Sequence, residues 1–279
     1  AASKEIGFAK EKGLTVIVTD HHEVPFIEDN GERTYILPPA DAVINTKQPG
    51  CPYPNKNLCG AVVAMKLIWA LYDDSHIPET EKEEFLELAA IATVGDVMDL
   101  QGENRILVKE GLKRLPYTKN KGLQALIRVT GLEGSRISSY HIGFVLGPCI
   151  NASGRLDTAA RSLRLLQCED AGEAARLAGD LKALNDSRKA LTEKGKDAAI
   201  QLIENTDLKK DLVLVVYLPE CHESLAGIIA GRIREKYNRP VFVLTKGEKG
   251  VKGSGRSIQQ YSMFEELVKC GDLLDQYGG

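Results

Sequence analysis

The sequence predicts an α/β protein with two domains joined by a long helix, and three observations support this fold class. Residues 14–19 and 212–217 are continuous apolar runs rich in β-branched residues, typical of strands buried on both faces of a parallel sheet with helices on each side. One helical pattern extends from 169 to 204, longer than a usual globular helix and suited to a connector between domains. A length of 279 residues fits two domains at roughly 150 residues each.

The elements of the first half follow one another along the chain. Residues 5–12 have a helical pattern and lead into the strand 14–19, which ends at Asp20-His21-His22. Residues 23–57 hold six prolines, so we expect an irregular excursion with a short strand near 42–44. After it we expect helices at 60–72, 79–94, 104–114 and 121–130, a helical or mixed segment at 138–146 that breaks at Gly147-Pro148, and a polar loop at 151–155.

The second half begins with the long helix. Gly195 lies inside this pattern and costs about 1 kcal/mol relative to Ala, so a bend or weak point is expected there. The strand at 212–217 follows. The order strand, helix, strand predicts a second α/β domain, completed by a helix at 224–236, a strand at 240–244 and a turn or strand start at 252–257.

The composition excludes several classes of protein. Lys and Arg number 36 against 39 Asp and Glu, which excludes a generally basic nucleic-acid coat but leaves a local basic groove open. No stretch approaches the roughly 18 apolar residues of a membrane span, and no apolar signal core begins the sequence. The six cysteines form no CxxC pair, so we expect free thiols in a reducing cytoplasm.

The strongest local signal is Asp20-His21-His22 at the end of a buried strand, because ligands bind at that edge of open α/β sheets. Imidazole and carboxylate together are good ligands for Mn²⁺ and similar ions. Asp96, just after the apolar run 88–94, is a second candidate at the rim of the core. For Asp20-His21-His22 the alternative is a loop with two surface histidines. For Asp96 the alternative is a capping or turn residue, a part that Asp99 could also play.

Two further segments combine Arg with small polar residues. Asn151 and Arg155 lie in the expected loop 151–155, and a guanidinium there is suited to bidentate phosphate capture. Ser254 and Arg256 lie in the Gly-Ser-Gly-Arg-Ser run, which has the makings of an anion nest. Helix capping by Asp157 explains the first segment equally well.

A cysteine hydrolase built on Cys221-His222-Glu223 is disfavoured, because a Cys and a His adjacent in sequence rarely face one another. A stacking platform for single strands is not indicated either, since only 6% of residues are aromatic.

Seven motifs in series resemble those of the DHH phosphoesterase superfamily and, within it, the RecJ-like exonucleases. They cover essentially the whole chain: 16–23 (VIVTDHHE), 58–60 (LCG), 93–100, 147–156 (GPCINASGRL), 184–188 (LNDSR), 222–232 and 253–257. Other DHH enzymes would not be expected to carry the fourth and fifth motifs together.

The resemblance implies the domain organisation. Residues 1–165 would be the later part of a parallel-sheet DHH domain, 166–208 the connecting helix, and 209–279 the first part of a smaller α/β DHH-associated domain that binds nucleic acid. The active site would lie in the cleft between the domains. The family's Asp-x-Asp and a further upstream Asp have no counterpart in the chain, which ends on Gly278-Gly279 where the family has Gly-Gly-His. The resemblance therefore implies an internal fragment that lacks most of the metal-binding carboxylates and is inactive by itself.

The resemblance also implies roles for individual residues. Two divalent ions, Mn²⁺ or Mg²⁺, would activate water and stabilise charge on the scissile phosphate. His21 and Asp96 would be metal ligands, His22 would face that phosphate, and Asp20 would orient the histidines.

The remaining roles concern the nucleic acid. Arg155, with Asn151 nearby, would stabilise the negative charge that develops on the scissile phosphate. Ser254 and Arg256 would hold the terminal 5′ phosphate, and His222 would line the same cleft. The chain departs from the family at Cys149 (often Arg), Cys221 (often Trp), Ser224 (often Gly) and Asp99 (often Pro).

The implied function is metal-dependent 5′→3′ hydrolysis of single-stranded DNA from its 5′ end, in DNA repair and recombination. The implied partners are such DNA and other repair proteins, in the cytoplasm and away from membranes. Two alternatives stay open: another DHH phosphodiesterase acting on short oligonucleotides or cyclic dinucleotides, and a non-catalytic nucleic-acid-binding module.

Overall fold

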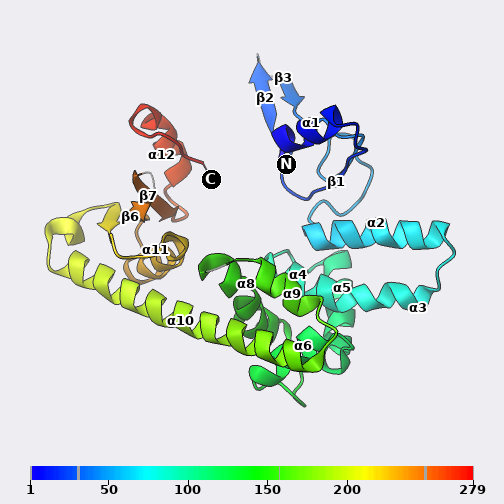
Figure 1. Ribbon diagram of the computed structural model, residues 1–279. Coiled ribbons are helices and arrows are strands. Elements are labelled where there is room, and N and C mark those ends of the chain that lie inside the picture. The colour runs from blue at the N-terminus through cyan, green and yellow to red at the C-terminus, as the bar shows by residue number, and fades with distance from the viewer. Residues whose placement is uncertain (1, 30–31, 157, 248–249, 279) are drawn as a thin grey trace. The chain divides into compact units, whose positions relative to one another are not determined.

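The computed structural model describes residues 2–29, 32–156, 158–247 and 250–278, and the chain divides into two compact units (Figure 1). The first unit comprises residues 1–148 and 165–178, and the second comprises residues 149–164 and 179–279. The expected domain boundaries near 165 and 208 stay predictions. Of the helices in the described ranges, none is both long and apolar enough to cross a membrane.

The first unit contains a two-stranded parallel sheet of β1 (Ile17–Thr19) and β4 (Ala42–Ile44). It follows helix α1 (Ser3–Glu11), and the excursion between the two strands forms a hairpin of β2 (Phe26–Asp29) and β3 (Glu32–Tyr35). The prediction of a doubly buried strand at 14–19 is wrong, because Leu14 and Ile17 are 57% and 56% exposed. Among the described residues β1 pairs along one edge only, so no layered sheet surrounds it.

Helices make up the rest of this unit, beginning with α2 (Gly60–Asp74). The helix expected at 79–94 divides into α3 (Glu79–Lys82), the 3₁₀ turn η1 (Glu83–Phe85) and α4 (Leu86–Gly95). The indole of Trp69 donates to the carbonyl of Lys82 at 3.0 Å, which occupies an acceptor that a continuous helix would use. A core cluster joins α2 to α4 and to α5 (Gly102–Arg114): Leu58, Cys59, Val62, Val63, Met65, Ala89 and Leu107.

Beyond α5 the chain forms η2 (Leu115–Tyr117) and α6 (Lys121–Val129), whose first turn is capped by the Asn120 side chain. A further helical stretch contains α7 (Ser139–His141), the π-helical turn η3 (Ile142–Leu146) and α8 (Gly147–Leu156).

The predicted break at Gly147-Pro148 and the predicted loop at 151–155 are therefore wrong, because both segments lie in α8. Gly147 and Pro148 directly follow the π-helical turn η3, and the helical stretch continues through them. The small residues Ala152 and Ser153 are fully buried, and the Ser153 hydroxyl lies 2.8 Å from that of Ser162 in α9 (Ala160–Leu166). They serve helix packing and do not open the backbone to an anion. Asp157, the alternative capping residue, lies outside the described residues.

The second unit contains a three-stranded sheet in the order β5 (Leu214–Tyr217), β6 (Val241–Gly247), β7 (Gly250–Arg256). β5 and β6 are parallel and β7 is antiparallel, so the chain has the predicted α/β class with parallel strand pairing. Helix α11 (Glu223–Tyr237) and the end of α10 (Ala171–Glu204) cover one face through the buried side chains Ala199, Ile203, Leu214, Val216, Leu225, Ala226, Ile229, Ala230, Ile233, Val241 and Val243. The short elements η4 (Asp207–Lys210), α12 (Met263–Lys269) and η5 (Gly271–Leu273) complete the unit.

The predicted long helix is present as α10, which is one continuous helix (Figure 1). Gly195 does not interrupt it. A Cβ at this position would lie 2.5 Å from Cδ1 of Ile229, so the glycine allows α11 to pack closely against α10. The residue that was expected to weaken the helix instead permits the contact that buries Ile229.

We predict opposite effects on stability for two glycine substitutions in helices. In Gly111→Ala the new Cβ would lie 2.3 Å from the carbonyl oxygen of Leu86 and 2.5 Å from Cβ of Ala90, so α5 must move away from α4. We expect a loss of about 2 kcal/mol in the free energy of unfolding. Gly179→Ala in α10 meets nothing within 4 Å and should add about 0.5–1 kcal/mol. Urea unfolding followed by circular dichroism measures both, and equal effects would contradict the packing argument.

Candidate active site

The three residues after β1 form a compact polar turn. The Asp20 amide donates to the carbonyl of Ile44 at 3.0 Å, which ties the turn to the end of β4. Asp20 Oδ1 accepts from the amides of His21 (2.7 Å) and His22 (3.1 Å) and lies 2.7 Å from Nδ1 of His22. Partial burial raises the pKa of Asp20, but the hydrogen bonds from His22 and His21 outweigh it and lower the pKa to about 2. The ionised carboxylate therefore holds the His22 ring by Nδ1 and leaves Nε2 on an exposed side chain.

His21 points to a different partner. Its Nδ1 lies 3.5 Å from Oδ2 of Asp96, the residue that ends α4, so the two predicted metal ligands meet. The imidazole of His21 rests on the first residue of α2. A Cβ on Gly60 would lie 3.1 Å from its Cδ2, tighter than an ordinary van der Waals contact. The absence of a side chain at Gly60 thus sets the position of the ring.

Residues without a role in the sequence prediction hold this cluster in place. Asn45, buried just after β4, donates from Nδ2 to the carbonyl of His22 at 2.9 Å. The Cys59 thiol lies 3.6 Å from the hydroxyl of Thr93, and both side chains are buried, which links the start of α2 to the last turns of α4. Gly60 and Cys59 belong to a motif of the family resemblance, whereas Asn45 gives no signal beyond following a strand.

The donor set of this cluster fits a divalent ion in part. A neutral imidazole nitrogen and a carboxylate oxygen are good ligands for Mn²⁺ and its neighbours, and their 3.5 Å separation lets both bind one ion. In the described ranges no group of three or more His, Cys, Asp or Glu side chains is arranged to hold a metal. His21 and Asp96 therefore supply two donors, and a two-ion site requires additional ligands.

In the second unit, polar side chains gather around the first turns of α11. His222 is the N-cap residue; its Nδ1 accepts from the amide of Ser224 at 3.3 Å and lies 2.8 Å from the hydroxyl of Ser224. Arg155, near the end of α8, donates from Nη1 to the carbonyl of Ser224 at 3.1 Å. Asn151 lies one helical turn before Arg155 and is exposed. The structure thus brings Arg155 and His222 to the same helical turn.

Ser254 and Arg256 reach α11 from β7. Arg256 Nη1 donates to the Ser254 hydroxyl at 3.3 Å. A Cβ on Gly227 would lie 2.7 Å from this hydroxyl oxygen and 2.8 Å from Nη2 of Arg256, so both side chains lie directly against the helix. The alternating Gly253 and Gly255 occupy the opposite face of β7, where a Cβ on Gly253 would lie 2.4 Å from Cδ2 of Leu244. The Gly-Ser-Gly-Arg segment is therefore a strand that presents side chains, and not a backbone nest.

Arg188 adds a further cation that the sequence prediction did not assign, although it belongs to the LNDSR motif. Its Nε and Nη2 donate to Oδ1 of the buried Asn185 at 3.2 and 3.0 Å. Burial lowers the pKa of the Arg188 guanidinium, and the charge of Arg155 lowers it further. Two guanidinium groups from different helices are thus close enough to repel one another, an arrangement that an anion relieves.

Cys221 and Cys149 lack the environment of a catalytic nucleophile. Burial raises the pKa of the Cys221 thiol, the opposite of what a thiolate nucleophile requires, and the neighbouring His222 ring is engaged by Ser224. Cys149, where the family often has Arg, is buried and accepts from Nδ2 of Asn185 at 3.5 Å. These contacts agree with the sequence argument against a cysteine hydrolase. All six cysteines are free.

Comparison with known proteins identifies the family. The model of the DHH family, N-terminal domain, matches residues 1–93, which include the Asp-His-His segment. The single-stranded-DNA-specific exonuclease RecJ of Bacillus subtilis is 40% identical over the whole chain, and that of Escherichia coli is 37% identical over 95% of it. The chain belongs to the DHH family. It covers 34% and 47% of those two relatives, so it spans between a third and a half of their length.

Solved structures of RecJ share the fold. A RecJ structure from Thermus thermophilus in complex with Mn²⁺ matches with a TM-score of 0.82 and 35% identity, covering all of this chain and 39% of that one. A second structure, of exonuclease RecJ bound to manganese, matches with a TM-score of 0.79 and 36% identity, covering all of this chain and 66% of that one. The RecJ-like resemblance of the motifs is thereby confirmed.

We predict that Gly227→Ala weakens the binding of inorganic phosphate by the second unit, because the methyl group displaces Ser254 and Arg256. Loss of a charge-assisted hydrogen bond of about 1–2 kcal/mol corresponds to roughly a fivefold to thirtyfold weaker affinity. Gly231→Ala, one turn further along the same helix, meets nothing within 4 Å and is the matched control. Isothermal titration calorimetry measures both variants, and equal affinity in the two would contradict the placement of Ser254 and Arg256.

Proposed function

We propose that this chain is part of a metal-dependent exonuclease that hydrolyses single-stranded DNA in the 5′→3′ direction, in cytoplasmic DNA repair and recombination. The observation that carries the proposal is the meeting of His21 and Asp96, whose side chains come from the end of β1 and the end of α4. The names of the relatives, single-stranded-DNA-specific exonucleases, support the substrate class. RecJ structures in complex with Mg²⁺ and with Mn²⁺ support the choice of Mn²⁺ or Mg²⁺.

In this proposal the first unit supplies the groups at the scissile phosphate. His21 and Asp96 would hold a divalent ion, and this ion would supply activated water and charge stabilisation when bound. Asp20 fixes the ring of His22 through Nδ1. The ring is therefore already oriented before the substrate binds, with Nε2 directed to the phosphate. Because the pKa of Asp20 is about 2, its carboxylate stays ionised throughout the physiological pH range.

The second unit holds the phosphates of the strand. Arg155 and Asn151 act on the charge that develops during hydrolysis, whereas Ser254 and Arg256 hold the terminal 5′ phosphate and His222 lies beside them. Water forms a new bond to phosphorus, the bond to the 3′ oxygen breaks, and that oxygen takes up the proton which water releases. A mononucleotide leaves, and the shortened strand again begins with a 5′ phosphate that fits the same site.

A non-catalytic nucleic-acid-binding module is the second candidate. It is favoured by one observation, that two donor groups and not three or more meet at His21 and Asp96 among the described residues. In that case the second unit would bind phosphates and the first would contribute no turnover.

We predict that Asp96→Asn lowers the affinity of the chain for Mn²⁺ at least tenfold, because a neutral amide replaces the charged carboxylate of the His21–Asp96 pair. Asp99→Asn removes an equal charge three residues away and should leave the affinity unchanged. The free Mn²⁺ signal in electron paramagnetic resonance measures both. An unchanged affinity in Asp96→Asn would remove this residue from the metal site.

We predict that a full-length protein containing this chain degrades 5′-phosphorylated single-stranded DNA with Mn²⁺ and leaves duplex DNA intact. His21→Ala should abolish this turnover while circular dichroism shows an unchanged fold, and the 279-residue chain alone should show little activity. Gel analysis of strands labelled at the 3′ end measures the products. Preferential cleavage of dinucleotides would favour another DHH phosphodiesterase, and binding without cleavage would favour the non-catalytic module.

A further inference from the structure

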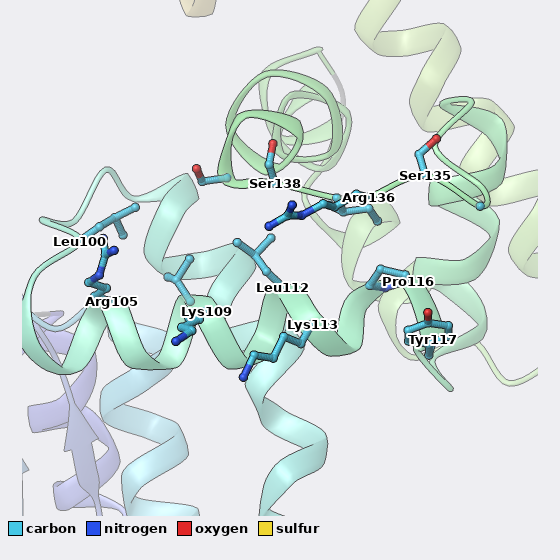
Figure 2. A pocket seen from close by; sticks show the side chains of 14 residues that line it. Leu100, Arg105, Lys109, Leu112, Lys113, Pro116, Tyr117, Ser135, Arg136 and Ser138 are labelled. Atoms are coloured by element: carbon cyan, nitrogen blue, oxygen red, sulfur yellow. The ribbon is translucent and has the colours of Figure 1, made fainter.

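The first unit contains a groove to which the proposed function assigns no role. Its volume is about 740 Å³, and it lies between α5 and the segment 134–139, which ends at the first residue of α7 (Figure 2). None of Asp20, His21, His22 and Asp96 lines it. The groove is therefore separate from the candidate active site within the same unit.

The charge of the groove is of one sign. Arg105, Lys109 and Lys113 recur every four residues along α5, which places them on one face over about 12 Å of helix axis. Arg136 extends from the opposite side toward Leu112 (Figure 2). The described lining contains four cations and no acidic residue, in a protein whose net charge is −3.

Most of these cations have no partner within the described chain. Lys113 forms an ion pair with Glu110 at 2.7 Å, but the side chains of Arg105, Lys109 and Arg136 make no hydrogen bond or ion pair with another described residue. All three are exposed at the edges of the groove. Their charges are thus available to an anionic ligand at little cost, since no internal ion pair has to be broken.

The floor of the groove is apolar. Val108 and Ile137 are buried beneath it, and Leu100 and Leu112 lie beside them with part of their surface exposed. Tyr117, 85% exposed, stands at one end next to Pro116 (Figure 2). An apolar side chain of a ligand would be removed from water here, whereas a sugar-phosphate backbone offers no such group. The single aromatic residue of the lining is also too few for the successive base stacking of a single strand.

We propose that this groove binds a short acidic peptide segment of a partner protein, with apolar side chains on the floor and carboxylates at Arg105, Lys109 and Arg136. A stripe of about 12 Å matches roughly four residues of an extended peptide, at about 3.3 Å per residue. Charge complementarity selects the acidic partner, and the apolar floor selects a peptide over a nucleic acid. The proposal is independent of nuclease activity.

The test is fluorescence anisotropy with the 279-residue chain and a fluorescein-labelled decapeptide that carries Asp and Glu on both sides of a central Leu-Phe pair. We expect saturable binding that weakens as sodium chloride is raised. The double variant Lys109→Glu/Arg136→Glu should bind at least tenfold more weakly. The matched control Lys4→Glu/Lys12→Glu changes the net charge equally at α1, away from the groove, and should bind within twofold of the unchanged chain.

Two probes separate this proposal from its rivals. A decapeptide of equal charge with Ser in place of Leu and Phe should bind at least fivefold more weakly, and equal binding would overturn the proposal. An unlabelled twelve-nucleotide thymidine strand that displaces the peptide more effectively than unlabelled peptide would identify a nucleic-acid site instead. If the double variant fails to fold by circular dichroism, Lys109→Gln/Arg136→Gln replaces it, with an expected loss of at least threefold. An affinity unaffected by these changes would also overturn the proposal.

Discussion

The close approach of functional side chains to the backbone of a helix at glycine is the constraint on which both candidate clusters depend. His21 rests on Gly60 at the start of α2, and Ser254 and Arg256 rest on Gly227 in the second turn of α11. A methyl group at Gly227 would overlap the functional side chains, and one at Gly60 would press the His21 ring outward by a few tenths of an ångström. The meeting of His21 with Asp96 and the pairing of Arg256 with Ser254 follow from these two contacts. Packing against the helix backbone therefore determines where the reactive groups lie, and charge interactions adjust their geometry.

Electrostatics then explains why a chain with a net charge of −3 has a site suited to phosphate. The N-terminus of α11 is positively polarised, and Arg155 and Arg256 lie at its first turns. Arg188 adds a third guanidinium close enough to Arg155 to lower its own pKa. Bringing like charges together is unfavourable in the protein alone, so the cluster gains most when an anion is bound. The net charge is a sum over the whole chain, so it does not reveal this local positive potential.

The sequence predicted the fold class and most helices because periodic apolar patterns report burial directly, as for α10 and α11. The prediction failed where tertiary packing overrides the local preference of small residues for loops and of glycine for helix ends. Ala152 and Ser153 were predicted to lie in a loop, but they are small because α8 and α9 pack closely. Gly195 was predicted to weaken its helix, but the absence of a side chain there makes room for Ile229. The candidate site residues were proposed from motifs. Their pairing was not predictable from spacing, because His21 and Asp96 meet only through the packing of α2 on α4. The contribution of Asn45 requires the structure, since an Asn after a strand usually marks only a turn.

The cluster around α11 and the groove beside α5, both basic, differ in how their cations are held. In the second unit Arg155 and Arg256 are held by hydrogen bonds to Ser224 and Ser254, so their donors are already oriented when a phosphate arrives. Fixed donors are what stabilisation of a developing charge requires, because no reorganisation accompanies the reaction. In the groove, Arg105, Lys109 and Arg136 carry no such bonds and stand over an apolar floor. Cations that no hydrogen bond fixes stabilise a transition state poorly but adapt to peptides whose carboxylates differ in spacing. Similar side chains thus suit the proposed hydrolysis where hydrogen bonds orient them, and the proposed peptide binding where they do not.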